Sequence, residues 1–254
     1  MGFNNTTDMN TSPSKFAAYV IVVLAYLIGG GSLLVWLVFL FYGSLNLVNF
    51  GMDETAKLLL NACLCIAFFI QHSTMIRKSF KSWIAKFIRV DFFGALYTIS
   101  SGVLLLVLVI LWQKSAYSLV VSQGIIRWLF YVVFFMSIVG FNWGTRSLGS
   151  FDGFGTKPIL NCLHNADTPR PTSFTVRGPY RWVRHPLYTF TLLMIWSCPD
   201  LTLDRLLHNI LWTFWIIIGS ILEERDLVAS HGNKYRNYQS NVPMLIPRTI
   251  RPAQ

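Results

Sequence analysis

Six apolar runs, separated by short polar or basic segments, dominate the pattern of this chain. A helix needs about 20 apolar residues to cross a bilayer, and the first run is long enough to cross with a tilt. Only a few residues around Pro199 separate the last two runs, so these two must form an antiparallel hairpin. The pattern predicts an all-α, polytopic integral membrane protein of about six transmembrane helices with a C-terminal helical hairpin. The expected spans are 16–42, 56–71, 91–112, 125–143, 186–201 and 204–222.

The segments outside these runs define the expected organisation. A length of 254 residues suits a single membrane domain, 1–254. Residues 1–15 are polar and rich in Asn and Thr, which predicts a disordered tail. Residues 16–143 hold the first four spans, and residues 144–254 form a C-terminal half that begins with the longest connection of the chain. A loop as long as 144–176 is usually functional or disordered.

Charge fixes the expected orientation. The chain is 54% hydrophobic and 13% charged, with a net charge of +10. Five of its 21 Lys and Arg residues lie in the segment 71–90, six in 144–185, five after Leu222, and one at Lys15, whereas four lie on the other side. The positive-inside rule places both termini in the cytoplasm. Topology therefore explains the basic residues, and we expect no nucleic-acid partner. The four cysteines lack metal-ligand spacing, so no metal site is predicted.

The segment Arg177–Tyr188, RGPYRWVRHPLY, combines cationic and aromatic side chains just before an apolar run. Proline suits the first position of a helix, which predicts a helix start at Pro186 with Arg184 and His185 just outside it and Tyr188 on its first turn. A helix N-terminus beside cationic groups favours anions. The alternative is a basic juxtamembrane loop that contacts lipid headgroups.

A second polar segment follows the last span and reads EERDL. The hairpin brings Glu223, Glu224 and Asp226 to the same membrane face as His185. Ionised carboxylates at a bilayer boundary are costly unless they are paired or solvated. They could bind a cationic ligand group, or they could form an internal salt bridge to Arg181 or Arg184. The segment 242–247, VPMLIP, is apolar and cannot be a regular helix, which suits a segment at the bilayer surface.

Two features of the first half are also informative. His72 ends the second span, just before the basic loop that begins at Arg77, and it is either a substrate-site group or a satisfied interfacial histidine. Gly29, Gly30 and Gly31 interrupt the first span, and we interpret them as a close helix–helix contact at small residues.

The ordered set GPYRWVRHPLY, EERDL, G-x-x-Y-x-x-Y and VPMLIP resembles the C-terminal half of the isoprenylcysteine carboxyl methyltransferase and phospholipid methyltransferase superfamily. The resemblance covers residues 144–248. Residues 71–81 match a QHSxMxRxxFK pattern that is similar to the methanethiol S-methyltransferase branch and its NnrU-like relatives. Where those enzymes have an HFDLFGL-like segment, this chain has SFDGFGTKP at 150–158.

The resemblance implies an S-adenosyl-L-methionine-dependent methyltransferase with its active site at the cytoplasmic face of a bacterial inner membrane. The implied acceptor is a small hydrophobic thiol, with methanethiol-like thiols favoured, or a lipid, and membrane lipids are expected partners. No covalent enzyme nucleophile is required for methyl transfer from a sulfonium, so the resemblance names no catalytic residue. The implied cofactor-binding residues are Tyr180, Arg184, His185, Tyr188, Glu223 and Glu224, and the possible acceptor-site residues are His72 and Arg77.

Two other functions stay open at this point. Nicotinamide-dependent sterol or steroid reductases resemble the HPxY element, although EERDL offers acids where phosphate contacts would be expected. A non-enzymatic membrane protein, such as a small transporter, is the second alternative. Transport paths usually carry ionisable residues at mid-membrane, and the apolar runs of this chain lack them.

Overall fold

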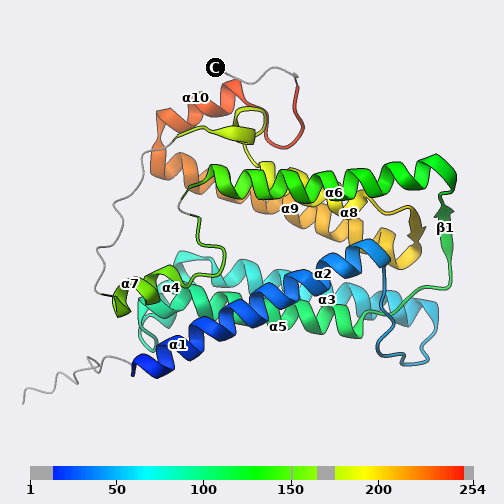
Figure 1. The fold of residues 1–254 in the computed structure, drawn as a ribbon, viewed down its shortest axis with the longest axis horizontal. Coiled ribbons are helices and arrows are strands. Elements are labelled where there is room, and N and C mark those ends of the chain that lie inside the picture. The colour runs from blue at the N-terminus through cyan, green and yellow to red at the C-terminus, as the bar shows by residue number, and fades with distance from the viewer. Residues whose placement is uncertain (1–13, 150, 165–174, 249–254) are drawn as a thin grey trace, which may run out of the picture.

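The computed structural model describes residues 14–149, 151–164 and 175–248, and within them the chain is mostly helical (Figure 1). The predicted all-α membrane architecture is confirmed. Residues 1–13 of the predicted tail, and part of the loop 144–176, lie outside the described residues. The elements are α1 (Lys15–Leu24), η1 (Ala25–Gly30), α2 (Gly31–Tyr42), α3 (Glu54–Met75), α4 (Lys78–Ile84), η2 (Val90–Phe92), α5 (Phe93–Leu111), β1 (Ser118–Val121), α6 (Gly124–Ser147), α7 (Lys157–Leu163), η3 (Gly178–Arg181), α8 (Pro186–Trp196), β2 (Asp200–Thr202), α9 (Leu203–His231) and α10 (Asn233–Asn241).

Five helices in the described residues are long and apolar enough to cross a membrane. The first is continuous through α1, the π-helical turn η1 and α2, and the others correspond to the second, third, fourth and sixth predicted spans. Their outward side chains are largely exposed apolar groups, as lipid requires. The five helices are Lys15–Tyr42, Glu54–Met75, Val90–Leu111, Gly124–Ser147 and Leu203–His231.

The structure shortens the fifth predicted span, 186–201. Its helix α8 has 11 residues, which at 1.5 Å per residue is roughly 16 Å, about half the hydrocarbon thickness. The helix ends at Trp196, and Pro199 follows, which cannot donate a backbone hydrogen bond. The chain then forms β2, which pairs antiparallel with β1. The predicted hairpin of α8 and α9 is present, but its first arm is a half-length helix.

Glycines allow helices to approach closely at two places. A Cβ atom at Gly29 would lie 2.4 Å from the side chain of Thr98 on α5, which confirms the predicted close contact at Gly29. The prediction was wrong for Gly31, where a Cβ atom would meet nothing within 4 Å. A Cβ atom at Gly140 on α6 would lie 2.3 Å from the ring of Phe190 on α8. The short helix α8 is thus held flat against α6, and the start of α8 is fixed by this packing.

The segment after α6 folds back onto the first span. The ring of Phe154 packs against Tyr26, with ring centroids 4.9 Å apart, and its carbonyl accepts a hydrogen bond of 3.0 Å from Thr98 Oγ1. The helix α7 follows directly. This part of the predicted long loop therefore covers α1 and α5 instead of extending into solvent.

The two ends of the bundle differ in character. Figure 1 shows α4, α7 and α10 gathered at one end and β1 at the opposite end. At the β1 end, the buried carboxylate of Asp204 accepts hydrogen bonds from Trp112 Nε1 (2.9 Å) and from the backbone N–H of Ser115 (3.0 Å). Buried polar groups of this kind are tolerated when every partner is supplied. We call the other end, where the tail and the loop 71–90 lie, the α10 end.

Candidate active site

The C-terminal tail folds back onto the start of α8. The backbone N–H groups of Arg184 and His185 donate to the carbonyls of Pro243 and Met244, at 2.9 and 3.1 Å. His185 is the N-cap residue and Pro186 the first helical residue, so the predicted helix start is confirmed. The backbone of the apolar segment 242–247 therefore holds Arg184 and His185 in place through these two hydrogen bonds.

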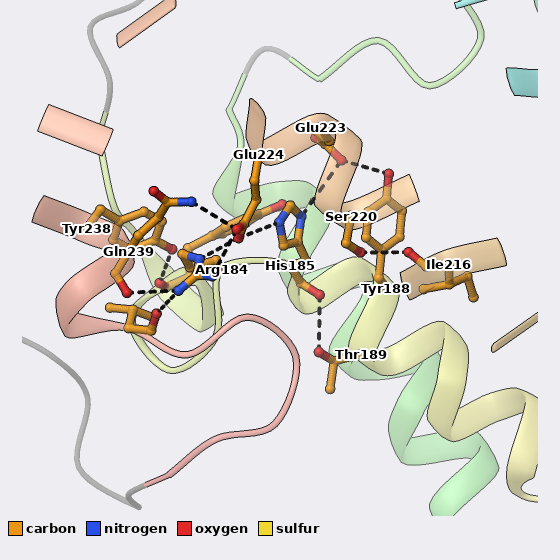
Figure 2. A network of polar contacts seen from close by, with 12 residues as sticks. Arg184, His185, Tyr188, Thr189, Ile216, Ser220, Glu223, Glu224, Tyr238 and Gln239 are labelled. Carbon is orange, nitrogen blue, oxygen red and sulfur yellow. Dashed lines mark hydrogen bonds and ion pairs between the residues drawn. The ribbon is translucent and has the colours of Figure 1, made fainter. Parts of the chain in front are cut away.

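Arg184 is the centre of a buried ionic network (Figure 2). Its guanidinium contacts the carboxylate of Glu224 through two atom pairs, Nε–Oε1 at 2.5 Å and Nη2–Oε2 at 3.0 Å. Its Nη1 donates to the carbonyls of Gln239 (3.0 Å) and Val242, and Gln239 Nε2 donates to Glu224 Oε2 at 2.9 Å. Of the two alternatives for this acidic segment, the internal salt bridge to Arg184 is therefore correct for Glu224.

His185 and Tyr188 lead from this network to the second glutamate. His185 Nε2 lies 3.2 Å from Glu224 Oε1, and its Nδ1 lies 3.8 Å from Glu223 Oε2. The rings of His185 and Tyr188 stack with centroids 5.5 Å apart, and the Tyr188 hydroxyl donates to Glu223 Oε2 at 2.9 Å. The Glu223 side chain is 46% exposed and that of Glu224 is 11% exposed. Glu223 is thus the carboxylate that a ligand can reach.

A cavity of about 600 Å³ opens beside these residues. Its lining includes five of the six residues predicted to bind the cofactor, namely Tyr180, Arg184, His185, Tyr188 and Glu223. The sixth, Glu224, lies behind Arg184 and is not part of the lining. Tyrosines of α10 complete one wall of this cavity.

Three tyrosines near this cavity are neutral hydrogen-bonding groups. Burial raises the pKa of Tyr180 and Tyr238 above the ordinary phenol value, and it raises the pKa of Tyr235 to about 12. The Tyr238 hydroxyl donates to the Tyr180 carbonyl at 2.5 Å, which ties α10 to η3. These residues offer aromatic faces and hydroxyl groups to a ligand and carry no charge at neutral pH.

A second cavity of about 380 Å³ lies between α3 and α9. Both residues predicted for an acceptor, His72 and Arg77, are in its lining, together with apolar side chains such as those of Ile76 and Trp215. The residues that line this cavity are His72, Ser73, Ile76, Arg77, Tyr97, Tyr188, Trp215, Ile216, Gly219, Leu222, Glu223 and Asp226.

The two cavities share a wall. Tyr97, Tyr188 and Glu223 line both of them. A ligand in the larger cavity and a second ligand in the smaller cavity would therefore contact the same three side chains from opposite sides. The two cavities therefore adjoin at these residues.

The segment 71–73 links α3 to its neighbours around the smaller cavity. Gln71 Nε2 donates to Ser100 Oγ on α5 at 3.0 Å, and Trp215 Nε1 on α9 donates to Ser73 Oγ at 3.1 Å. Between them, His72 Nε2 lies 2.5 Å from the hydroxyl of Tyr97. Gln71 and Ser73, on either side of His72 in the QHS motif, thus bind α3 to α5 and to α9 and so fix the position of His72.

Tyr97 is the site residue that sequence reasoning missed. It lies in the apolar third span, where an aromatic residue is ordinarily a packing residue, and nothing in its local pattern separates it from Phe93 or Phe92. The available signal was indirect, because a half-buried histidine such as His72 is expected to have a hydrogen-bonding partner. Only the packing of α3 against α5 identifies that partner.

Several known proteins are similar to this chain over most of its length. It is 35% identical over 204 residues to methanethiol S-methyltransferase of Pseudomonas deceptionensis, covering 78% of this chain and 75% of the relative. It is 37% identical over 203 residues to methanethiol S-methyltransferase of Pseudomonas sp. (strain GM41(2012)), covering 78% and 76%. A more distant similarity, 24% over 184 residues and 68% of each chain, is to Nurim of Rattus norvegicus.

No family model and no solved structure matches the chain. The relatives do not favour the reductase alternative. With identity above one third over three quarters of both sequences, and with the predicted motifs gathered around two adjoining cavities, this chain belongs to the methanethiol S-methyltransferase family of integral membrane methyltransferases.

Proposed function

We propose that this protein transfers a methyl group from S-adenosyl-L-methionine to a small apolar thiol, with methanethiol as the favoured acceptor. The observation that carries the proposal is the wall of Tyr97, Tyr188 and Glu223 shared by the two cavities. The larger cavity would hold the methyl donor and the smaller one the thiol. The names of the bacterial relatives supply the acceptor class.

The larger cavity suits the donor in size and chemistry. Its volume of about 600 Å³ lies within the range of about 300–1,000 Å³ that is typical of small-molecule sites. The donor brings a carboxylate, an ammonium, an adenosine and the sulfonium that supplies the methyl group. Glu223 is accessible for the ammonium or the ribose hydroxyls, and the faces of Tyr180 and Tyr188 suit the adenine or the sulfonium.

Arg184 and Glu224 have a different role in this proposal. They neutralise each other and bind the α10 tail, so they hold the cavity wall instead of contacting the donor with a free charge. The N–H groups of Arg184 and His185 are bonded to the tail, and Pro186 has none. The donor carboxylate would therefore be left to the first turn of α8 at Leu187 and Tyr188, which line the cavity and where backbone N–H groups and the helix dipole favour an anion.

The smaller cavity suits an apolar acceptor. Ile76, Trp215, Ile216 and Leu222 provide apolar surface, and Glu223 faces the donor side. Methyl transfer from a sulfonium needs in-line approach of the nucleophile and a dry site. In this proposal the acceptor would approach from the smaller cavity, on the side of the methyl group opposite the leaving sulfur.

The orientation of the site follows from charge. The α10 end carries the basic segments that the positive-inside rule assigns to the cytoplasm, and the bacterial relatives support an inner-membrane location. The donor would enter from the cytoplasm, while an apolar thiol would arrive through the bilayer.

The direct test is an assay of the purified protein in detergent or nanodiscs with S-adenosyl-L-methionine and methanethiol. We expect stoichiometric S-adenosylhomocysteine and dimethyl sulfide, measured by chromatography of the solution and of the headspace. A panel with a prenylated cysteine and with phosphatidylethanolamine tests the lipid-like alternative. Methylation of either of these without methylation of any small thiol would refute the assigned acceptor.

A further inference from the structure

The geometry points to a proton relay in which Tyr97 and His72 remove the proton of the acceptor thiol during methyl transfer. This inference rests on the proposed function and adds the residues that activate the nucleophile. It assigns a reaction step to Tyr97, which lines both cavities, and to His72, which lines the smaller cavity and lies within hydrogen-bonding distance of the Tyr97 hydroxyl.

A thiol acceptor needs such a group. The thiolate is the nucleophile, and even a free cysteine thiol, with a pKa of about 8.5, is only a few per cent ionised at neutral pH. A simple alkanethiol lacks the electron-withdrawing amide groups of cysteine and is less acidic still. An apolar cavity raises the pKa of a thiol further, because burial disfavours the charged form. The smaller cavity therefore binds the acceptor in its unreactive form unless a base is within reach.

The contacts of His72 leave it one route for a proton. Its Nε2 lies 2.5 Å from the Tyr97 hydroxyl, and its Nδ1 is buried with no hydrogen-bond partner among the described residues. With the proton on Nδ1, the lone pair of Nε2 accepts the hydroxyl proton of Tyr97. The ring lies close to Phe68, at a centroid distance of 5.3 Å, and to Trp215, at 5.2 Å.

The other ionisable groups of the cavity are placed for different tasks. Glu223 already accepts from Tyr188 and faces His185, and Asp226 lies one helical turn further toward the α10 end. Arg77 also lines the cavity and favours a negative charge on sulfur, but it cannot accept a proton. Of these side chains and Tyr188, Tyr97 is the one that has an imidazole as its hydrogen-bond partner.

The step balances in atoms and charge. The thiol sulfur forms a bond to the methyl carbon as the bond from that carbon to the sulfonium sulfur breaks, and the bonding pair stays on the leaving sulfur. The thiol proton moves to the Tyr97 oxygen while the proton of Tyr97 moves to His72 Nε2. The positive charge of the sulfonium is thereby replaced by one on the imidazole ring, so the net charge beside Glu223 does not change.

Two acceptors of similar size and different acidity test this relay, namely ethanethiol and 2,2,2-trifluoroethanethiol, whose fluorines lower the pKa of the thiol. General acid–base catalysis contributes ~10²–10⁴-fold, so Tyr97→Phe should lose at least ~10²-fold in kcat/KM with ethanethiol and less with the fluorinated thiol. His72→Gln should show the same selective loss. Tyr26→Phe is the matched control, because the Tyr26 hydroxyl contacts Thr156 away from both cavities and should leave both rates unchanged.

The pH dependence gives an independent measurement. Without the relay, the rate of Tyr97→Phe with ethanethiol should follow the thiolate concentration and fall tenfold per pH unit below the pKa of the thiol, whereas the wild-type rate should fall less steeply. Affinity for S-adenosylhomocysteine, measured by calorimetry, should stay near wild type in Tyr97→Phe and so report an intact fold.

The possible outcomes distinguish a failure of the relay from a failure of the proposed function. Equal losses with both thiols, at unchanged pH dependence, would give the Tyr97–His72 contact a structural role and refute the relay while the proposed function stands. A wild-type protein that methylates neither methanethiol nor these two larger thiols would refute the proposed function itself.

Discussion

The carboxylate of Glu224 and the guanidinium of Arg184 form a two-point ion pair, at 2.5 and 3.0 Å, with both side chains about 10% exposed. The next residue back, Glu223, is 46% exposed and points toward Tyr188. Two consecutive glutamates on α9 thus have opposite surroundings. One holds the tail against the helix hairpin, and the other faces the cavities.

This difference predicts two distinct phenotypes. Removing one partner of a buried ion pair costs about 3–5 kcal/mol because the other charge is left unpaired, so Glu224→Gln should lower the free energy of unfolding by about 3 kcal/mol or somewhat less, since the amide keeps part of the hydrogen bonding. Glu223→Gln should leave stability unchanged and weaken S-adenosylhomocysteine binding about tenfold or more. Thermal unfolding and calorimetry on both variants check this, and equal stability losses would contradict it.

The acceptor range should depend on Gly219. This glycine lines only the smaller cavity of the two, and a Cβ atom there would meet nothing within 4 Å. Gly219→Leu should therefore fill the cavity without disturbing the helix packing, raising KM for thiols larger than methanethiol while the affinity for S-adenosylhomocysteine stays the same. Gly31→Leu is the control, because Gly31 is also helical and unobstructed but lies outside both cavities. An unchanged range of thiols in Gly219→Leu would place the acceptor elsewhere.

The contact of α6 with α8 should be intolerant of added volume. A Cβ atom at Gly140 would lie 2.3 Å from the ring of Phe190. Overpacking of this kind typically lowers the free energy of unfolding by about 1–3 kcal/mol. Gly140→Ala should lower the melting temperature and also weaken donor binding, because α8 carries His185 at its start. A variant with normal stability and binding would show that α8 can move away from α6 freely.

Topology can be tested with reporter fusions. The chain after Gly43 and at Ser118 lies at the β1 end, and α7 just after Thr156 lies at the α10 end (Figure 1). Fusions after Gly43 and after Ser118 should be external, and one after Thr156 should be cytoplasmic. An external reporter at Thr156 would contradict a cytoplasmic donor site.

The C-terminal half was the most predictable part of the chain. Pro186 at the first position of α8 and the polar groups on both sides of it carry strong local signals, so the helix start and the meeting of His185 with Glu223 followed from the sequence. The length of α8 did not. Its end at Trp196 depends on the chain turning into β2, whose partner β1 lies about 80 residues earlier, and no local pattern reports such a pairing.

Contacts between spans that are distant in the sequence were the second feature that the sequence could not predict. Hydropathy identifies α3 and α5 but not which of their faces meet, so His72 appeared as a candidate and Tyr97 did not. The sequence also could not choose between Arg181 and Arg184 as the partner of Glu224. That choice depends on the backbone of the segment 242–245, which positions Arg184 through Pro243 and Met244.

Under the proposed function, the wall of Tyr97, Tyr188 and Glu223 would also link the binding of the two substrates thermodynamically. A donor that draws Glu223 toward its ammonium alters the hydrogen bond to Tyr188, and with it the shape of the neighbouring cavity. Linkage is reciprocal, so the factor by which the donor changes thiol affinity equals the factor by which the thiol changes donor affinity. In a protein built in this way, the occupancy of each cavity would depend on the concentrations of both substrates.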